Sequence, residues 1–492
     1  FAKIGFDENV DDRAKIALAW GATAETAAKH KVLELADGVR FLLWILFDKA
    51  DLNATPLLTR FGTAARDLLV FSWTQSISLL ATNAIRFVAK GYVSNVEGSR
   101  ALLQQIIEEP RFTEHAHEEA PWLAEGIEPI IACDPDFAVK IYEVLFTNEV
   151  SQDGKSWFGG TQSRILPLVS NRRQDYEHAR WHLARHLKKF FAVNPTKAAE
   201  AAIVASRFAA KHGGSTRYES IEIQLRTGGT VHLSHDRHAL QDWRDSSHRG
   251  NEEDLLSYVA EYLKQCSPTQ FSEVVTVAKG LLTGSEIWTR LMGVAAERSD
   301  IPFDCLWEEA STPQWMALQG LMFDTIGYLR AKYSSVPEPQ RADFENAVLT
   351  YGTTLSGDKR KWWGSVQARL LSTVPPDALA TGELRALRDK LVGEDKLQGN
   401  TPLITITSGW SDGEEIADVL IERQGANLKE GRNPELRSAS SALEAGVKAG
   451  LPPNDDALVA LWNLAKGVVE KIDAVGEQAH EATIHAAWGA VS

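Results

Sequence analysis

Apolar residues recur at the spacing of an amphipathic helix along most of the chain. Positions i, i+3, i+4 and i+7 fall on one face of an α-helix, so this pattern predicts helices that bury one side. Many of these segments open at Asp-Pro, Asn-Pro or Ser-Pro and end near Gly or Pro, which are typical start and stop signals. The predicted helices cover residues 38–50, 65–92, 100–109, 134–146, 194–214, 251–266, 267–283, 285–299, 312–335, 339–355 and 455–490, the last with a break near Gly476. Tryptophans that lie in such stripes are expected in the core, and they are Trp20, Trp44, Trp73, Trp181, Trp288 and Trp462.

Two stretches depart from the helical pattern. Residues 220–236 alternate apolar and polar positions on either side of Thr227-Gly228-Gly229, which predicts a β-hairpin. Residues 401–428 combine a short β-like run, a Gly-rich turn and a helical pattern, so we expect a small module that begins near 395–410.

Helices joined by short turns, without a parallel-strand pattern, favour helix pairs stacked in series. We predict an all-α fold, an irregular α-solenoid of antiparallel HEAT- or TPR-like pairs with a β-hairpin insert near 220–236. A closed α/α toroid is the alternative. The predicted segments are an N-terminal array over 1–150, a segment with a basic helix and the hairpin over 151–250, a repeat array over 251–395 and a small C-terminal module over 396–492.

Charge and composition exclude several classes of partner. Of the 492 residues, 44% are hydrophobic, and 52 basic against 66 acidic residues give a net charge of -14. An acidic surface repels phosphate, which argues against general nucleic-acid binding. No run approaches the roughly 18–20 apolar residues that cross a bilayer, so no membrane partner is expected. The cysteines are Cys133, Cys266 and Cys305, too few and too scattered for a disulfide framework, which favours a cytoplasmic location.

The common catalytic motifs are missing from the sequence. Residues 153–157 contain the Gly-Lys-Ser of a P-loop, but Glu149 stands where the loop needs its first glycine. No GxGxxG and no GxSxG motif occurs. We therefore assign no catalytic residue, no metal and no cofactor to this chain by itself.

A basic, histidine-rich helix is predicted over 176–191. His178, His182 and His186 recur every four residues and so lie along one face. A zinc site is one interpretation, but the Glu of an HExxH motif is replaced by Ala179 and the surrounding Lys and Arg oppose a bound cation. A solvated basic face, or one that contacts an acidic partner, agrees better with the composition.

Three further histidines follow the predicted hairpin turn, at 232, 235 and 238. On a continuing strand His232 and His235 point to opposite faces, so they do not converge on a metal ion. Asp236 has a simpler role as the N-cap of a short helix that follows. We expect this stretch to close the hairpin and to contribute to partner contact.

The run from Asp134 to Ile203, followed by a hairpin insert and further helix pairs, resembles the C-terminal helical-repeat sensor arm of bacterial STAND-type antiviral ATPases of the AVAST kind. In that family an effector and a P-loop ATPase precede the arm, and the arm recognises a phage protein such as terminase or portal. The resemblance implies oligomerisation on recognition, and ATP and Mg²⁺ bound in a domain upstream of Phe1. It is architectural, and no catalytic residue of the family is carried over to this chain.

Two function hypotheses follow. The first is a protein-recognition arm of a longer multidomain protein, whose contacts come from the basic helix and the hairpin. The second is a metal-dependent hydrolase or α/α-toroid enzyme that uses the His- and Asp-rich stretches. The predicted partner-binding residues are Arg172, Arg173, Arg185, Lys188, Lys189, Arg226, His232, His235 and Arg237.

Overall fold

A computed structural model describes residues 26, 29–30, 33–49, 55–150, 171–212, 218–236, 243, 251–402, 427, 429–449, 455–475, 479, 483–484 and 487. The chain divides into two compact units. The first contains Phe1–Ser156 and Leu168–Ile406, and the second contains Trp157–Pro167 and Thr407–Ser492. The division after Ile406 falls inside the 395–410 stretch. Most of 401–428, the P-loop-like residues 153–157 and Arg237 lie outside the described residues.

Helices dominate the described part of the chain, so the predicted all-α class is confirmed. The 3-10 turns between them are Tyr92–Ser94, Phe303–Cys305, Tyr333–Ser335 and Pro376–Ala378. The helices of the first unit are α3 (Leu33–Lys49), α4 (Thr55–Thr74), α5 (Ser78–Lys90), α6 (Val96–Ile106), α7 (Arg111–Glu125), α8 (Glu128–Cys133), α9 (Pro135–Thr147), α10 (Asn171–Val193), α11 (Pro195–His212), α12 (Asn251–Gln265), α13 (Pro268–Gly280), α14 (Ser285–Glu297), α15 (Trp307–Ala310), α16 (Pro313–Ala317), α17 (Gln319–Lys332), α18 (Glu338–Thr354), α19 (Gly357–Thr373) and α20 (Gly382–Gly393).

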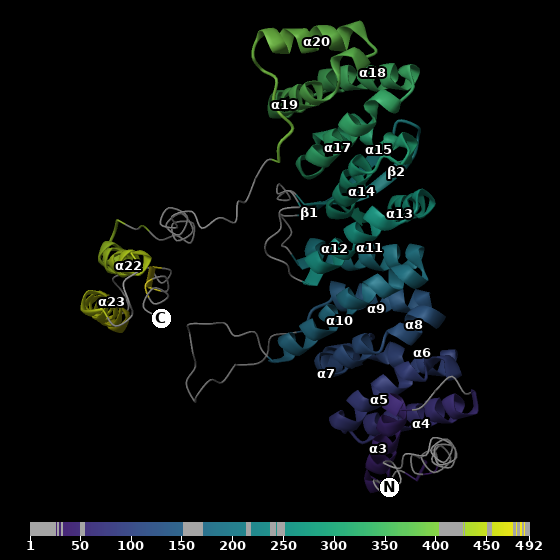
Figure 1. Ribbon diagram of the computed structural model, residues 1–492. Coiled ribbons are helices and arrows are strands. Elements are labelled where there is room, and N and C mark those ends of the chain that lie inside the picture. Colours follow the sequence, from purple (N-terminus) through teal and green to yellow (C-terminus); the bar gives the residue numbers. More distant parts are fainter. Residues whose placement is uncertain are drawn as a thin grey trace. The chain divides into compact units, whose positions relative to one another are not determined.

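The helices of the first unit follow one another in rows. Along one row each helix packs against the next, in the order α3, α5, α7, α10, α12, α14, α17 and α19. Beside it, α9, α11 and α13 pack in the same manner. In Figure 1 this series runs from α3 at one end to α20 at the other, whereas a closed toroid would bring the first and last helices together.

Local signals in the sequence set several helix starts. Asp134 is the N-cap of α9, where its carboxylate accepts a hydrogen bond from the Phe137 amide at 3.2 Å. Ser267 and Gln270 form a reciprocal capping box at the start of α13. These helices begin where the Asp-Pro and Ser-Pro pairs predict.

Two predicted helices are divided in the structure. The segment 65–92 forms α4 and α5, because Ser76 adopts a left-handed φ of 55° that ends the first helix. The segment 312–335 forms α16 and α17, separated by Leu318 in an extended conformation. In both cases the apolar stripe continues across the break, so periodicity alone does not reveal it.

Buried apolar side chains form one core cluster in the first unit, from Ala36 to Leu384. In the second unit α22 (Asn433–Lys448) and α23 (Asp456–Val475) pack through a separate cluster that includes Leu436, Leu443 and Val469. The expected core position is right for Trp288, which is fully buried.

The predicted core position is wrong for three other tryptophans. Trp44, Trp181 and Trp462 are 44%, 40% and 38% exposed. Each lies on the outer side of its helix, since a helix packed on one side leaves a solvent face even where its sequence is apolar.

A small sheet interrupts the helices. Strands β1 (Tyr218–Gln224) and β2 (Thr230–Asp236) form the predicted antiparallel hairpin, with Ile221 opposite Leu233. The short strand β3 (Thr283–Gly284), which periodicity did not predict, pairs in parallel with β2. None of the described helices is long and apolar enough to span a membrane.

Candidate functional site

The hairpin turn has a defined geometry. The Leu225 amide donates to the Gly229 carbonyl at 2.7 Å, and the Gly228 amide donates to the Leu225 carbonyl at 3.0 Å. Gly228 has a φ of 101°, a conformation that residues with a Cβ rarely adopt. The predicted Thr-Gly-Gly turn therefore sets the register of the two strands.

Side chains of β2 alternate between two faces of the strand, and Ser234 is buried as well as the residues of the core face. Val231, Leu233 and His235 are buried, and His235 is only 5% exposed. His232 is exposed on the opposite face, where its Nδ1 lies 3.4 Å from Glu222 Oε1. The two histidines diverge, as the strand pattern predicts, and burial removes His235 from the surface on which a partner contact was predicted.

Hydrogen bonds from Arg226 hold the hairpin turn against the helices. Arg226, a predicted partner-binding residue, donates a hydrogen bond to the carboxylate of Asp343 on α18. Its second guanidinium nitrogen lies 3.5 Å from the Ser311 carbonyl. This side chain therefore positions the hairpin within the first unit. The proposed capping role of Asp236 concerns residues that are outside the described part of the chain.

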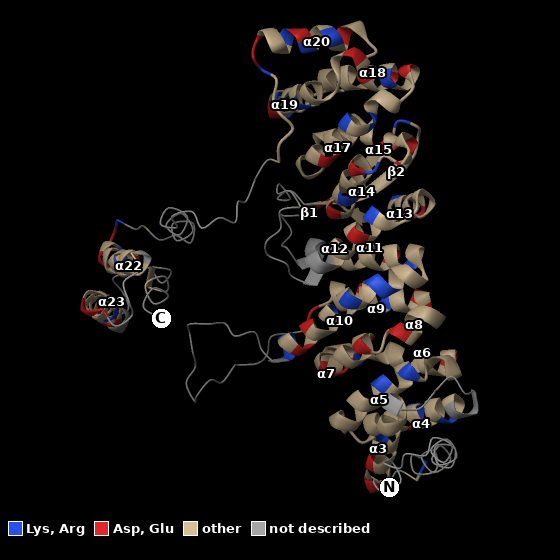
Figure 2. Cartoon of the chain, viewed as in Figure 1, with Lys and Arg blue, Asp and Glu red and all other residues tan. Residues whose placement is uncertain are grey.

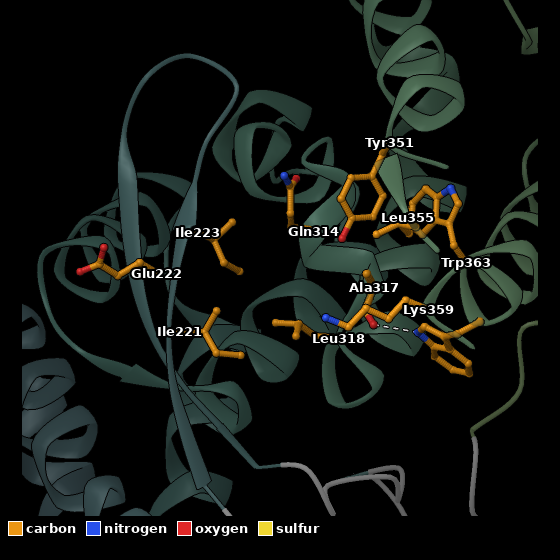
Figure 3. A pocket seen from close by; sticks show the side chains of 11 residues that line it. Ile221, Glu222, Ile223, Gln314, Ala317, Leu318, Tyr351, Leu355, Lys359 and Trp363 are labelled. Atoms are coloured by element: carbon orange, nitrogen blue, oxygen red, sulfur yellow. Dashed lines mark hydrogen bonds between the residues drawn. The ribbon is translucent and has the colours of Figure 1, made fainter. Parts of the chain in front are cut away.

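A pocket of about 300 Å³ lies between β1 and the helices α16, α18 and α19 (Figure 3). We refer to it as the hairpin pocket. Its lining comes from β1 and from α16, α18 and α19 with their C-terminal flanking residues. The lining residues are Ile221, Glu222, Ile223, Gln314, Ala317, Leu318, Tyr351, Leu355, Lys359, Trp362 and Trp363.

The aromatic walls of the hairpin pocket are held by hydrogen bonds to the backbone. The Trp362 indole donates to the Ala317 carbonyl at 2.8 Å, and the Trp363 indole donates to the Val348 carbonyl at 3.2 Å. The Tyr351 ring packs edge-on against Trp363, with 4.8 Å between the centroids. The polar atoms of both indoles are thus satisfied, which leaves their apolar surfaces to form a fixed wall.

Three polar groups in the hairpin pocket have no hydrogen-bond or ion-pair partner within the described part of the chain. They are the Tyr351 hydroxyl, the Gln314 amide and the Lys359 ammonium group. In Figure 3 the Tyr351 hydroxyl points into the space between the hairpin and the helices. Burial raises the pKa of Tyr351, so its hydroxyl stays neutral and able to donate a hydrogen bond. An apolar pocket with a few convergent polar groups is the usual form of a binding site.

Sequence reasoning missed the α19 side of this site. The signal was present in the run Lys359-Arg360-Lys361-Trp362-Trp363. Neighbouring residues on a helix are about 100° apart, so two adjacent tryptophans do not both point into one core. Trp363 is buried and Trp362 is half-buried at the edge of the pocket.

The basic helix predicted over 176–191 is α10. Arg173 lies 3.9 Å from Glu149, and Lys189 pairs with Glu128 on α8. Arg180 is buried and donates to the Leu145 and Asn148 carbonyls at the end of α9. Figure 2 shows both signs of charge interspersed along these helices. Much of the basic run therefore stabilises the contact between neighbouring helices.

Four of the exposed residues of α10 follow one another at helical spacing and form a stripe, which we term the α10 face. It consists of His178, Trp181, Arg185 and Lys188. The Arg185 guanidinium lies 4.5 Å from the centre of the Trp181 ring, in cation–π contact. Arg172 is also exposed, nearly two turns before this stripe. Exposed Trp and Arg are the residues most enriched at the energetic centre of protein interfaces.

The inner histidines of α10 are partly buried. Burial is the main cause that lowers the pKa values of His182 and His186, and His186 Nδ1 lies 3.2 Å from Glu128. Among the residues that the structure describes, no group of three or more His, Cys, Asp or Glu could hold a metal ion. Nothing in the described residues favours the metal-hydrolase hypothesis over a binding role.

Comparison with known proteins gives no assignment. No family model matches the chain, and no curated protein matches its sequence.

Proposed function

We propose that this chain is a protein-recognition arm, in which the hairpin insert provides the main contact surface. One observation carries the proposal. In a fold built of helices, the β1 edge lies beside the hairpin pocket, and among the described residues β1 pairs only with β2. An unpaired strand edge is a template for another chain, and a pocket next to it supplies side-chain specificity.

The α10 face is the proposed second contact. Trp181 and Arg185 supply a rigid aromatic and cationic surface, and Lys188 extends the positive charge. Arg173 and Lys189 are less suited to contact a partner, since each faces a carboxylate of its own chain. The overall net charge of -14 makes such a basic patch selective for acidic protein surfaces.

The identity of the partner rests on the resemblance to STAND-type sensor arms. We propose a cytoplasmic partner that is a phage structural or packaging protein, such as portal or terminase. In this proposal partner binding drives oligomerisation of an ATPase attached upstream of Phe1, and ATP and Mg²⁺ bind in that domain.

Co-purification tests the proposal directly. The chain, tagged, is co-expressed with a phage portal protein or a terminase large subunit and analysed by size-exclusion chromatography. We expect co-elution that is lost when residues 226–229 are replaced by a different turn together with Trp181→Ala and Arg185→Glu. Lys361→Glu, an equal charge reversal at a residue that neither lines the hairpin pocket nor belongs to the α10 face, is the control. Failure of both phage proteins to co-elute contradicts the phage assignment, and co-elution that survives the combined changes contradicts the proposed surfaces.

A further inference from the structure

We infer that the β1 edge and the hairpin pocket form one site for an extended peptide, which pairs with β1 and places an apolar and an acidic side chain, two positions apart, on the pocket side. The inference rests on the proposed recognition function and names the class of ligand. It follows from three observations. They are the alternation of hydrogen-bonded and non-hydrogen-bonded pairs along the hairpin, the lining of the pocket and the charges at its edge.

The ladder determines which backbone groups of β1 face outward. Leu225 and Gly229 are joined by a hydrogen bond at the turn. Hydrogen-bonded and non-hydrogen-bonded pairs alternate along an antiparallel ladder, so from the register the outward groups of β1 belong to Ser220, Glu222 and Gln224. These three residues can therefore bond to an added strand without any change in the hairpin.

The same phase determines where the side chains of an added strand point. Residues opposite Ile221 and Ile223 project to the same face as these two isoleucines. Both isoleucines line the hairpin pocket, and Ile223 is 2% exposed. Since side chains alternate along a strand, two residues of the peptide separated by one position enter the pocket side, and the residue between them points away.

Charge at the edge of the hairpin pocket selects the second side chain. Lys359 and Arg360 lie on the first turns of α19, and neither has an ion-pair partner in the described part of the chain. The next cation, Lys361, pairs with Asp358 at 3.2 Å. Glu222 also lines the pocket, but its carboxylate lies beside His232, 3.4 Å from the imidazole Nδ1. On a chain with a net charge of -14, the unpaired Lys359 in the lining of an aromatic pocket favours a carboxylate on the ligand.

Two synthetic peptides of identical composition test this arrangement by fluorescence anisotropy. Both are seven-residue, amino-terminally labelled chains of threonine with one phenylalanine and one aspartate. In the first the two residues are separated by one threonine, and in the second they are adjacent. Each is made in both orders, because the direction of the added strand is not specified. We expect at least one order of the spaced peptide to bind about tenfold more tightly than the adjacent peptides, which present the two side chains on opposite faces.

Variants of the chain separate backbone pairing from side-chain contact. Glu222→Pro removes an outward amide and is expected to weaken binding about tenfold, whereas Glu222→Gln, which keeps the amide, retains it. Lys359→Glu should abolish the preference for the spaced peptide, and Lys361→Glu should leave it unchanged. Two N-methylated forms of the spaced peptide test pairing without altering the protein. In one the threonine between the two side chains is methylated, which blocks antiparallel pairing, and in the other the phenylalanine and the aspartate are methylated, which blocks parallel pairing. One of the two forms should lose binding.

Each other outcome overturns the inference. Equal binding of spaced and adjacent peptides excludes a strand in this register. Retained binding by both N-methylated peptides shows that the pocket takes the side chains without strand pairing. The same conclusion follows if phenylacetate alone competes as strongly as the spaced peptide. If no peptide binds while a phage protein still co-elutes with Glu222→Pro, the recognition function stands and the peptide site is wrong.

Discussion

Arg226 at the hairpin turn donates a hydrogen bond to Asp343 on α18, across 117 positions of sequence. This contact holds the hairpin beside the pocket that it lines. Arg226 is 21% exposed and Asp343 is 74% exposed, so solvent screens the pair and we expect it to contribute about 0.5–1 kcal/mol.

Arg226→Ala should therefore loosen the hairpin without unfolding the first unit. The expected result is faster hydrogen exchange at the amides of β1 and β2, with little change in the melting temperature. Asp343→Asn should have the same effect, and the double variant should add nothing further. Arg330→Ala, an exposed arginine on α17, is the control. Unchanged exchange in Arg226→Ala would show that the hairpin is held by its apolar face alone.

Glu345 connects α18 to α20 and should be a major contributor to stability. Its buried carboxylate accepts hydrogen bonds from the Tyr333 hydroxyl at 2.5 Å, from the Ala380 and Thr381 amides, and from the Thr381 hydroxyl. Glu345→Ala leaves one buried and several partly buried donors unsatisfied, which should lower the free energy of unfolding by about 3 kcal/mol. Chemical denaturation measures this value, and Glu383→Ala, an exposed glutamate on α20, should change it by less than about 0.5 kcal/mol. Similar losses in the two variants would contradict the assigned network.

Trp363 supports the pocket from within the core. It is 1% exposed and contacts Tyr351 and the Val348 carbonyl. Trp363→Ala should cost about 3–5 kcal/mol because it leaves a large cavity. Trp181→Ala removes an equal side chain from the exposed α10 face and should cost less than about 1 kcal/mol. Denaturation curves that rank these two variants in the opposite order would contradict the burial described here.

His117 should make stability depend on pH. Its imidazole is buried, which together with nearby Arg172 holds its pKa below the ordinary value of 6.5. As the pH falls below 6.5 the unfolded chain binds a proton that the folded imidazole resists, so the free energy of unfolding decreases. The contribution is fully present above that pH and is lost as the pH falls through the lowered folded pKa.

The test compares His117→Gln with His115→Gln, which changes an imidazole 44% exposed on the same helix. Unfolding is measured between about pH 7.5 and 5.5. His117→Gln should flatten the decrease in stability on acidification, and His115→Gln should follow the unchanged chain. His182 and His186 have pKa values lowered in the same direction, so part of the decrease should persist. An identical pH dependence in His117→Gln and the unchanged chain would contradict this role of burial.

The sequence predicted much of the candidate site's backbone and little of its chemistry. The Thr-Gly-Gly turn and the alternating pattern on either side predict the hairpin and the divergence of His232 from His235. The partner-binding role of Arg226 and His235 depended on exposure, which a strand pattern does not give. Arg226 donates a hydrogen bond to Asp343, far along the chain on α18, and His235 is buried. The sequence did not identify Trp362 and Lys359 as site residues, because they line the pocket only where the fold brings α19 opposite β1.

The sequence by itself determined the helix class, the starts of helices such as α9, α11, α13 and α14, and the hairpin with its turn, because periodicity, caps and glycine conformations are local properties. Only the tertiary structure decided where α4 and α16 end, which tryptophans face solvent and which basic residues of α10 pair with other helices. Those outcomes depend on neighbours that are tens of residues apart in sequence. The hairpin pocket is of this second kind, since its walls come from three separate stretches of the chain that meet only when the helices pack.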